Sequence, residues 1–243
     1  DVADRVTIQR WYSPQDGIPM LNLHHLENSR SQRILWLLED LGVDYRIKQY
    51  KRDPVTSLAP PELQAIHPLG KSPVITDGDT TVAESGAIIE YLVGKYDDGR
   101  LRPPEGTPER LAWTYWLHYA EGSFMPLMIV SLIMNRIENA PMPFFAKPIA
   151  KGITGKVRSN YLEPNVKRNL AFMEATLAKS TWFCGNAMTA ADIQMSFAVE
   201  AAEVRTDLKA HYPKLQGFLK RIRGLPAYQR ALEKGGPYSL LGK

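Results

Sequence analysis

Hydroxyl, imidazole and amide side chains gather in one short stretch of the sequence, residues 24–33 (HHLENSRSQR). An apolar run before it predicts a strand over residues 20–23, and an amphipathic pattern after it predicts a helix over residues 30–41. The N–H groups at a helix N-terminus have no partner within the helix and attract anions. The spacing Ser29-x-x-Gln32 is also that of a capping box. Ser29 is therefore predicted either to cap the helix or to hold its hydroxyl beside a bound anion, and the two roles are compatible.

Other side chains of this stretch offer alternatives to Ser29. Asn28 precedes it, and an amide N–H can also donate a hydrogen bond. His24 and His25 could be read as a metal-binding pair, but neighbouring residues on a strand point to opposite faces of the sheet. No metal site is therefore predicted here.

Two further groups of residues fit a ligand with an amino-acid head group. Lys71-Ser72-Pro73 lies at the start of a predicted strand, where a proline is either an ordinary entry residue or a special feature of an open strand edge. Glu84-Ser85 follows a second strand and opens a helix, so either residue could simply be its N-cap. A helix start with a serine hydroxyl also binds a carboxylate, and a neighbouring glutamate binds an ammonium group. These are the two charges of an amino acid.

The pattern of elements predicts an α/β domain followed by an all-helical one. Strands are expected over residues 44–50, 72–76 and 80–83, the last two joined by a hairpin turn at Asp77-Gly78, with a short helix ending near residue 66 and a longer one over residues 85–95. This order is that of a small thioredoxin-like sheet covered by helices. We expect an extension over residues 1–19, a sheet domain over 20–97, a linker over 98–108 and a helical domain over 109–243.

The composition excludes several classes of protein. The chain has 243 residues, 44% of them hydrophobic, and a net charge of +4 that is spread along the sequence, so no nucleic-acid partner is predicted. Its longest apolar run, residues 125–134, is too short to span a bilayer. The single cysteine, Cys184, excludes an internal disulfide, is expected to be a packing residue, and fits a reducing, cytoplasmic location.

The ordered set of motifs resembles the glutathione transferases. It comprises SRSxRILW from Ser29, HPLGKSP from His67, and AESG from Ala83. The stretches YKRD from Tyr50, YAEGS from Tyr119 and TAADI from Thr189 resemble the branch typified by a yeast enzyme and found in bacteria and fungi. The resemblance covers about residue 19 to the end of the chain. It implies a thioredoxin-like domain with a helical C-terminal domain, a homodimer, and a folding role for the Thr189 capping box.

The resemblance also assigns roles to the residues above. It implies that Glu84 and Ser85 bind the γ-glutamyl group of glutathione, and that Ser72, before a cis Pro73, pairs through its backbone with the cysteinyl part. Lys71 would contribute to the glycyl or cysteinyl end. Ser29 would donate its hydroxyl to the sulfur, with Asn28 as the alternative donor.

The reaction then implied is the attack of a glutathione thiolate on a small hydrophobic electrophile. Glutathione is expected as a co-substrate, with no tightly bound cofactor. Two alternatives stay open from the sequence: glutathione-dependent reduction of peroxides or disulfides at the same site, and a non-catalytic binding protein. Several aromatic residues are expected to divide between the core and the electrophile pocket: Trp113, Tyr115, Trp116, Tyr119 and Phe124.

Overall fold

A computed structural model describes residues 20–236 and residue 238, so the predicted extension over residues 1–19 lies outside the described part of the chain. Its first half contains the elements β1 (Leu21–Leu26), α1 (Ser31–Leu41), β2 (Tyr45–Tyr50), α2 (Pro61–Ile66), β3 (Val74–Asp77), β4 (Thr80–Ala83) and α3 (Ser85–Tyr96). This is the order that the sequence predicts. The first strand is longer than expected, because His24, His25 and Leu26 continue it and are all buried.

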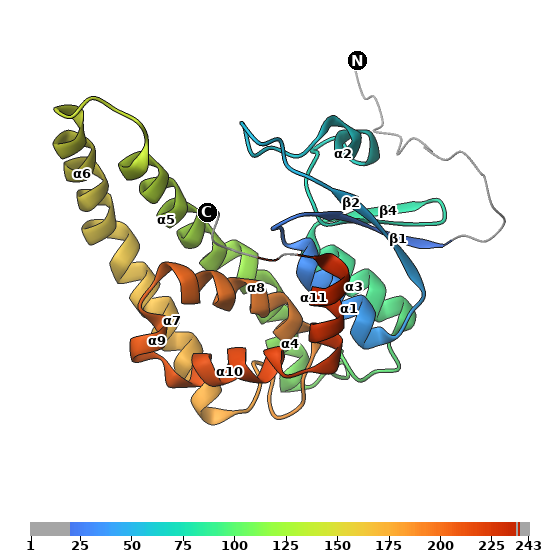
Figure 1. Ribbon diagram of the computed structural model, residues 1–243. Coiled ribbons are helices and arrows are strands. Elements are labelled where there is room, and N and C mark those ends of the chain that lie inside the picture. The colour runs from blue at the N-terminus through green and yellow to red at the C-terminus, as the bar shows by residue number, and fades with distance from the viewer. Residues whose placement is uncertain (1–19, 237, 239–243) are drawn as a thin grey trace, which may run out of the picture.

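The four strands form one mixed sheet in the order β2-β1-β3-β4. β1 and β2 are parallel, whereas β3 is antiparallel to both β1 and β4. Helices α1 and α3 cover one face of the sheet and α2 lies on the other (Figure 1). The register places His24 opposite Val74, and Val74 opposite Ala83. Consequently the end of β1, the start of β3 and the end of β4 meet at one edge of the sheet.

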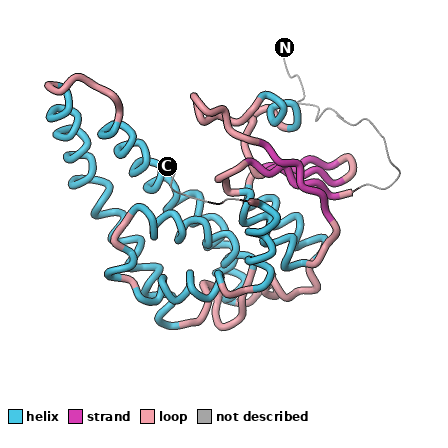
Figure 2. Tube along the Cα trace, in the orientation of Figure 1, coloured by secondary structure: helices cyan, strands magenta, loops and turns pink. Residues whose placement is uncertain are grey.

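The second half is helical, and Figure 2 shows it as a separate layer beside the sheet. It comprises α4 (Pro108–Tyr119), α5 (Met125–Asn139), α6 (Ala146–Val157), α7 (Glu163–Lys179), α8 (Ala190–Arg205), α9 (Leu208–His211), α10 (Pro213–Arg223) and α11 (Pro226–Gly235). Part of α5 and α6 projects beyond the body of the molecule as a two-helix arm (Figure 1). Helix α1 packs against α11 and α8, so the helix that follows Ser29 lies between the sheet and the helical half.

A π-helical turn, Ala120–Phe124, joins α4 to α5 and makes one continuous helix of 32 residues, Pro108–Asn139. This helix is long enough to cross a bilayer, and its most apolar 18 residues have a mean hydropathy of 1.3, whereas the apolar run over residues 125–134 is by itself too short. Its most apolar part is 44% buried, and Trp113 and Trp116 pack in the core. We therefore interpret it as a core helix. The π-helical turn ends two residues before Pro126, which lies in the first turn of α5.

The start of α8 confirms the second predicted capping box. The buried carboxylate of Asp192 accepts the Thr189 backbone N–H at 2.8 Å and the Thr189 hydroxyl at 3.0 Å, while its other oxygen accepts the Phe183 N–H at 2.8 Å. Burial raises the pKa of Asp192 to about 6, although these hydrogen bonds oppose the shift. Cys184 is buried and free, as predicted for a packing residue, and burial raises the pKa of its thiol to about 12.

The aromatic residues of α4 and the π-helical turn belong mainly to the core. Four of the five named in the sequence analysis are buried, and only Tyr115 is exposed, at 47%. Trp116 stacks on Phe172 and lies against Phe183, and Tyr119 packs on Trp116. These rings hold the helical half together.

Candidate functional site

The turn between β1 and α1 comprises residues 27–30 and presents Ser29 at the sheet edge defined above. Asn28 adopts a left-handed conformation with φ 50°, which asparagine tolerates better than most residues. Its side chain is exposed, whereas Ser29 is only 5% exposed. The turn therefore holds the Ser29 hydroxyl inward.

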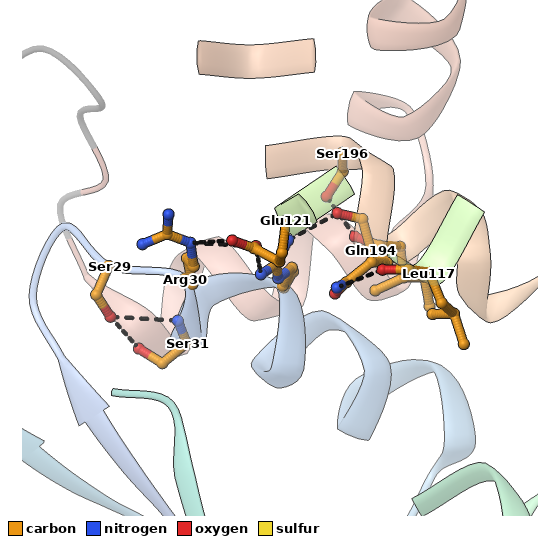
Figure 3. A network of polar contacts seen from close by, with 9 residues as sticks. Ser29, Arg30, Ser31, Leu117, Glu121, Gln194 and Ser196 are labelled. Carbon is orange, nitrogen blue, oxygen red and sulfur yellow. Dashed lines mark hydrogen bonds and ion pairs between the residues drawn. The ribbon is translucent and has the colours of Figure 1, made fainter. Parts of the chain in front are cut away.

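The Ser29 hydroxyl is fixed by short polar contacts (Figure 3). Its oxygen accepts the backbone N–H of Ser31 at 3.2 Å, and it lies 2.7 Å from the Ser31 hydroxyl and 3.4 Å from the Ser72 hydroxyl. The reciprocal capping box predicted with Gln32 is not formed. Helix α1 begins at Ser31 with Arg30 as its N-cap, and the buried side-chain nitrogen of Gln32 has no hydrogen-bond partner among the described residues.

Two buried groups behind Ser29 continue this network. The Ser31 hydroxyl lies 2.9 Å from His25 Nδ1 and 3.3 Å from the Leu26 carbonyl oxygen. Burial lowers the pKa of His25, and a hydrogen bond with the backbone of Gly235 opposes this shift. A neutral His25 with one nitrogen bound at Gly235 leaves Nδ1 to accept the Ser31 hydroxyl proton. The Ser31 proton is then directed away from Ser29.

His24 points to a different part of the molecule from His25. Its Nδ1 lies 2.8 Å from the Tyr50 hydroxyl, and its Nε2 lies 3.3 Å from the Thr76 hydroxyl. Burial, followed by the charge of Lys48, lowers its pKa to about 4. The two histidines therefore do not act as a pair.

The Ser72–Pro73 peptide bond is cis, as the resemblance implies. The Ser72 hydroxyl donates to the His24 carbonyl oxygen at 3.0 Å and accepts the Leu26 N–H at 3.3 Å, so it holds the loop against the end of β1. Strand β3 begins only at Val74, which leaves Lys71 and Ser72 outside the ladder. The Lys71 side chain is exposed and forms no hydrogen bond or ion pair with the described residues.

Glu84 and Ser85 lie at the same edge, directly after β4. Glu84 is the N-cap of α3 and has φ 70° and ψ 128°, an unfavourable conformation for a residue with a side chain. Strained residues of this kind cluster where ligands bind. Neither side chain caps the helix; the Glu84 carboxylate is exposed and without an ion pair in the described part of the chain, and Ser85 is buried. Both remain available to a ligand.

A clamp between the two halves holds α1 in place, and Figure 3 labels three of its residues, Arg30, Glu121 and Gln194. Glu121, in the π-helical turn, accepts from Arg30 Nε at 3.1 Å and from Arg33. Arg33 is buried, and its Nη1 also donates to the Gln194 carbonyl oxygen at 2.8 Å. π-Helical turns are rare and often mark functional sites. Here the turn directs Glu121 at Arg30, the N-cap of α1, and at Arg33 within α1.

The structure thus brings some predicted residues into contact and others only to a common edge. Ser29 and Ser72 are in direct contact, whereas Lys71, Pro73, Glu84 and Ser85 join them through the strand register. Sequence reasoning missed the roles of His25, Ser31, Arg30, Arg33 and Glu121. Glu121 lies 88 positions from Arg33, and no local pattern could have paired them.

Two family models match this chain. Residues 19–94 match the family model "Glutathione S-transferase, N-terminal domain", and residues 133–226 match "Glutathione S-transferase, C-terminal domain". The chain is 37% identical to glutathione S-transferase 3 of Schizosaccharomyces pombe, over 88% of both chains. It is 33% identical to glutathione S-transferase 1 of Saccharomyces cerevisiae, over 90% of this chain and 96% of that one.

A solved structure is similar over the same span. The crystal structure of a glutathione S-transferase from Actinobacillus pleuropneumoniae superposes with a TM-score of 0.73 at 35% identity, covering 89% of this chain and 93% of that one. The sequence matches and the fold agree, and the chain belongs to the glutathione S-transferase family.

Proposed function

We propose that this transferase binds glutathione along the shared edge of β1, β3 and β4 and joins it, through its sulfur, to small electrophiles. The observation that carries the proposal is the meeting of Ser29, Ser72 and Glu84-Ser85 at that edge, fixed by the register of His24, Val74 and Ala83. The edge offers a hydroxyl at one end and a helix N-terminus with a free carboxylate at the other. Glutathione presents a thiol and an amino-acid head group in the same order.

Each part of glutathione then has a partner. The N-terminus of α3 and the Ser85 hydroxyl hold the γ-glutamyl carboxylate, and Glu84 holds the ammonium group. Ser72, before the cis Pro73, pairs through its backbone with the cysteinyl unit. The free ammonium group of Lys71 reaches the glycyl carboxylate. The division of the chain proposed above, 20–97, 98–108 and 109–243, places all of these residues in the sheet domain.

Ser29 provides the chemistry in this proposal. A free thiol has a pKa near 8.5, so only a few per cent is thiolate at pH 7. The Ser29 oxygen accepts the Ser31 N–H, while its own proton points to the oxygen of Ser31 or Ser72. Rotation of the hydroxyl towards bound glutathione would turn that proton to the sulfur. The N-terminus of α1 adds a partial positive charge. The stabilised thiolate attacks an electrophilic carbon, a carbon–sulfur bond forms, and the leaving group departs with its electron pair.

Glu84→Gln tests the binding mode. It is expected to raise the KM for glutathione about tenfold, because a charged hydrogen bond to the ligand's ammonium group is lost. The wild-type protein should bind a glutathione analogue without this ammonium group less tightly than glutathione. The variant Glu84→Gln should bind the two ligands with similar affinity. Glu90→Gln, an exposed change on the same helix, is the matched control. If Glu84→Gln weakened the binding of glutathione and of the analogue by the same factor, the ammonium group would not lie at Glu84.

A panel of substrates run with the purified protein separates transfer from its alternatives. We expect conjugation of small electrophiles to exceed the reduction of peroxides and disulfides. Retention of glutathione without any turnover would indicate a binding protein instead. A detoxification role would follow from a broad range of accepted electrophiles. The reducing cytoplasm suits the free Cys184, and cell fractionation would test that location.

We also propose a homodimer, the assembly that the family resemblance implies. Apolar side chains are exposed on two surfaces: the loop patch (Val55, Leu58, Leu69) and the arm patch on α5, α6 and their connection (Ile133, Ile137, Phe144, Phe145, Ile149, Ile153). Apolar areas of this extent are unusual on a monomer. Sedimentation should give about twice the 27.4 kDa of one chain, and Ile149→Asp should shift it towards one chain. A wild-type mass of one chain would contradict the dimer.

A further inference from the structure

A buried serine–histidine network (Ser29, Ser31 and His25) leads from the turn into the protein. The Ser29 and Ser31 hydroxyl oxygens are 2.7 Å apart (Figure 3), and the Ser31 hydroxyl lies 2.9 Å from His25 Nδ1. Ser29 is 5% exposed, His25 3% and Ser31 0%. The network therefore joins the position assigned to the glutathione sulfur to a basic nitrogen that is shielded from water.

The direction of the protons along the serine–histidine network follows from His25. Burial lowers the pKa of His25, so its imidazole is neutral at pH 7, and its other ring nitrogen is taken by the backbone of Gly235. Nδ1 is then an acceptor, and the Ser31 hydroxyl donates to it. Because the Ser31 proton is committed to His25, the Ser31 oxygen accepts the Ser29 proton across the 2.7 Å contact. Both hydrogen bonds therefore run from Ser29 towards His25.

The C-terminal helix α11 holds the imidazole end of the network. It packs so closely on α1 that a Cβ at Gly235 would overlap the side-chain oxygen of Gln32. The two helices are also joined by an ion pair, in which Glu39 Oε2 lies 2.8 Å from Arg230 Nε. The His25 imidazole, which β1 carries, is thus fixed against α11.

The other branches of the network end at groups that do not take up a proton. Ser29 also lies 3.4 Å from the Ser72 hydroxyl, which donates to a peptide carbonyl oxygen at 3.0 Å. The Ser31 hydroxyl lies 3.3 Å from the Leu26 carbonyl oxygen. Peptide carbonyl oxygens accept hydrogen bonds but are not bases at neutral pH. Among the described groups that these hydrogen bonds join to Ser29, the imidazole of His25 is the one base.

We propose that the serine–histidine network carries the thiol proton of bound glutathione to His25. The thiol proton passes to the Ser29 oxygen, the Ser29 proton to the Ser31 oxygen, and the Ser31 proton to His25 Nδ1. The products are a thiolate and an imidazolium, and no proton leaves the protein. Each contact remains a hydrogen bond in the reverse direction, so Ser29 now donates to the thiolate, as the proposed function requires. His25 acts through the two serines without touching the substrate, and the inference rests on the glutathione site proposed above.

The charges of the two products stabilise each other. A free thiol has a pKa near 8.5, and burial lowers the pKa of His25, so the imidazole alone is too weak a base for this transfer. The N-terminus of α1 stabilises the thiolate, and a nearby negative charge raises the pKa of a histidine. The attraction between opposite charges is stronger inside a protein than in water. The thiolate and the imidazolium therefore form together.

Glutathione binding at pH 7 tests where the thiol proton goes. The thiolate is measured by its ultraviolet absorbance, and the protons released to solvent by calorimetry in buffers of different ionisation enthalpy. S-Methylglutathione, which has no thiol proton, gives the baseline for all other proton changes on binding. We expect the wild-type protein to form thiolate while releasing far less than one proton per thiolate. Release of one proton per thiolate would overturn the inference and leave the transferase activity standing, whereas failure to bind glutathione would refute the proposed function and the inference with it.

Two histidine variants separate proton transfer from support of the turn. His25→Asn places an amide oxygen near the position of Nδ1, where it accepts the Ser31 hydroxyl but takes up no proton. The thiolate fraction at pH 7 should fall about tenfold, the effect of a one-unit rise in thiol pKa, and each remaining thiolate should release one proton. His24→Asn, at the histidine that contacts Tyr50, should leave both quantities unchanged. Wild-type values in His25→Asn would overturn the inference, and the proton count of the wild-type protein decides the question even if this variant does not fold.

Discussion

Ser29→Ala is expected to lower kcat for glutathione conjugation at pH 7 about 100-fold. Removing one preorganised hydrogen-bond donor to an anion in an active site commonly lowers kcat by this factor. The hydroxyl is 5% exposed and is fixed by the Ser31 N–H at 3.2 Å and the Ser31 hydroxyl at 2.7 Å. No other side chain on the turn is buried and pointed at the same place. The loss should shrink as the pH rises above about 8.5, because free thiols then ionise without help.

Two matched changes locate this effect. Asn28→Ala removes the alternative donor, whose side chain is exposed, and we expect little change in kcat. Ser31→Ala removes the hydroxyl that orients Ser29 and should reduce kcat less than Ser29→Ala does. Stopped-flow or steady-state rates with a chlorodinitrobenzene measure all three. Full activity in Ser29→Ala together with its abolition in Asn28→Ala would transfer the role to Asn28.

Glu121→Ala is expected to lower the free energy of unfolding by about 3 kcal/mol, because it leaves a buried guanidinium without its carboxylate. The side chain of Arg33 is only 1% exposed, and among the described residues it would keep a hydrogen bond to the Gln194 carbonyl oxygen at 2.8 Å and its position over the Phe197 ring. Urea unfolding measures the loss. Since α1 is held by this clamp, the same change should also loosen the turn that carries Ser29.

A surface ion pair provides the control for Glu121→Ala. Glu105 bridges Arg102 and Arg110 at 3.1 and 3.0 Å but is 75% exposed. Glu105→Ala should therefore cost less than about 1 kcal/mol. Arg33→Met in the Glu121→Ala background should recover part of the stability, because the unpaired charge is then gone. Equal losses for Glu121→Ala and Glu105→Ala would show that the clamp contributes no more than a surface pair.

The two capping boxes show how far local sequence predicts structure. Thr189 and Asp192 form the capping box that the pattern predicts. The hydrogen bonds of the buried Asp192 carboxylate in this box go to Thr189, which is close to it in sequence. Ser29 and Gln32 do not. The Gln32 side chain packs closely against Gly235 of α11, more than two hundred positions away, so tertiary packing removes it from the turn. Local sequence patterns therefore predict the structure correctly where the contacts that determine it are also local.

The same distinction applies to the fold and to the site. Alternation, turn residues and family motifs predicted the order of strands and helices along the chain and the cis Ser72–Pro73 bond, because those features are local or shared by the family. The sequence patterns predicted too early an end for β1, because His24 and His25 are polar. In the structure both histidines are buried, and their ring nitrogens form hydrogen bonds with the hydroxyl groups of Tyr50 and Ser31. The clamp of Arg30 and Arg33 on Glu121 needs the fold to bring it together.

Thiolate absorbance of bound glutathione, recorded across a pH series, tests the central claim most directly. In the wild-type protein the bound thiol should titrate at least about one pH unit below its free value near 8.5, a stabilisation of about 1.4 kcal/mol. In Ser29→Ala the midpoint should return towards the free value. A wild-type midpoint equal to that of free glutathione, or one that Ser29→Ala leaves unchanged, would contradict the account of how this site activates sulfur.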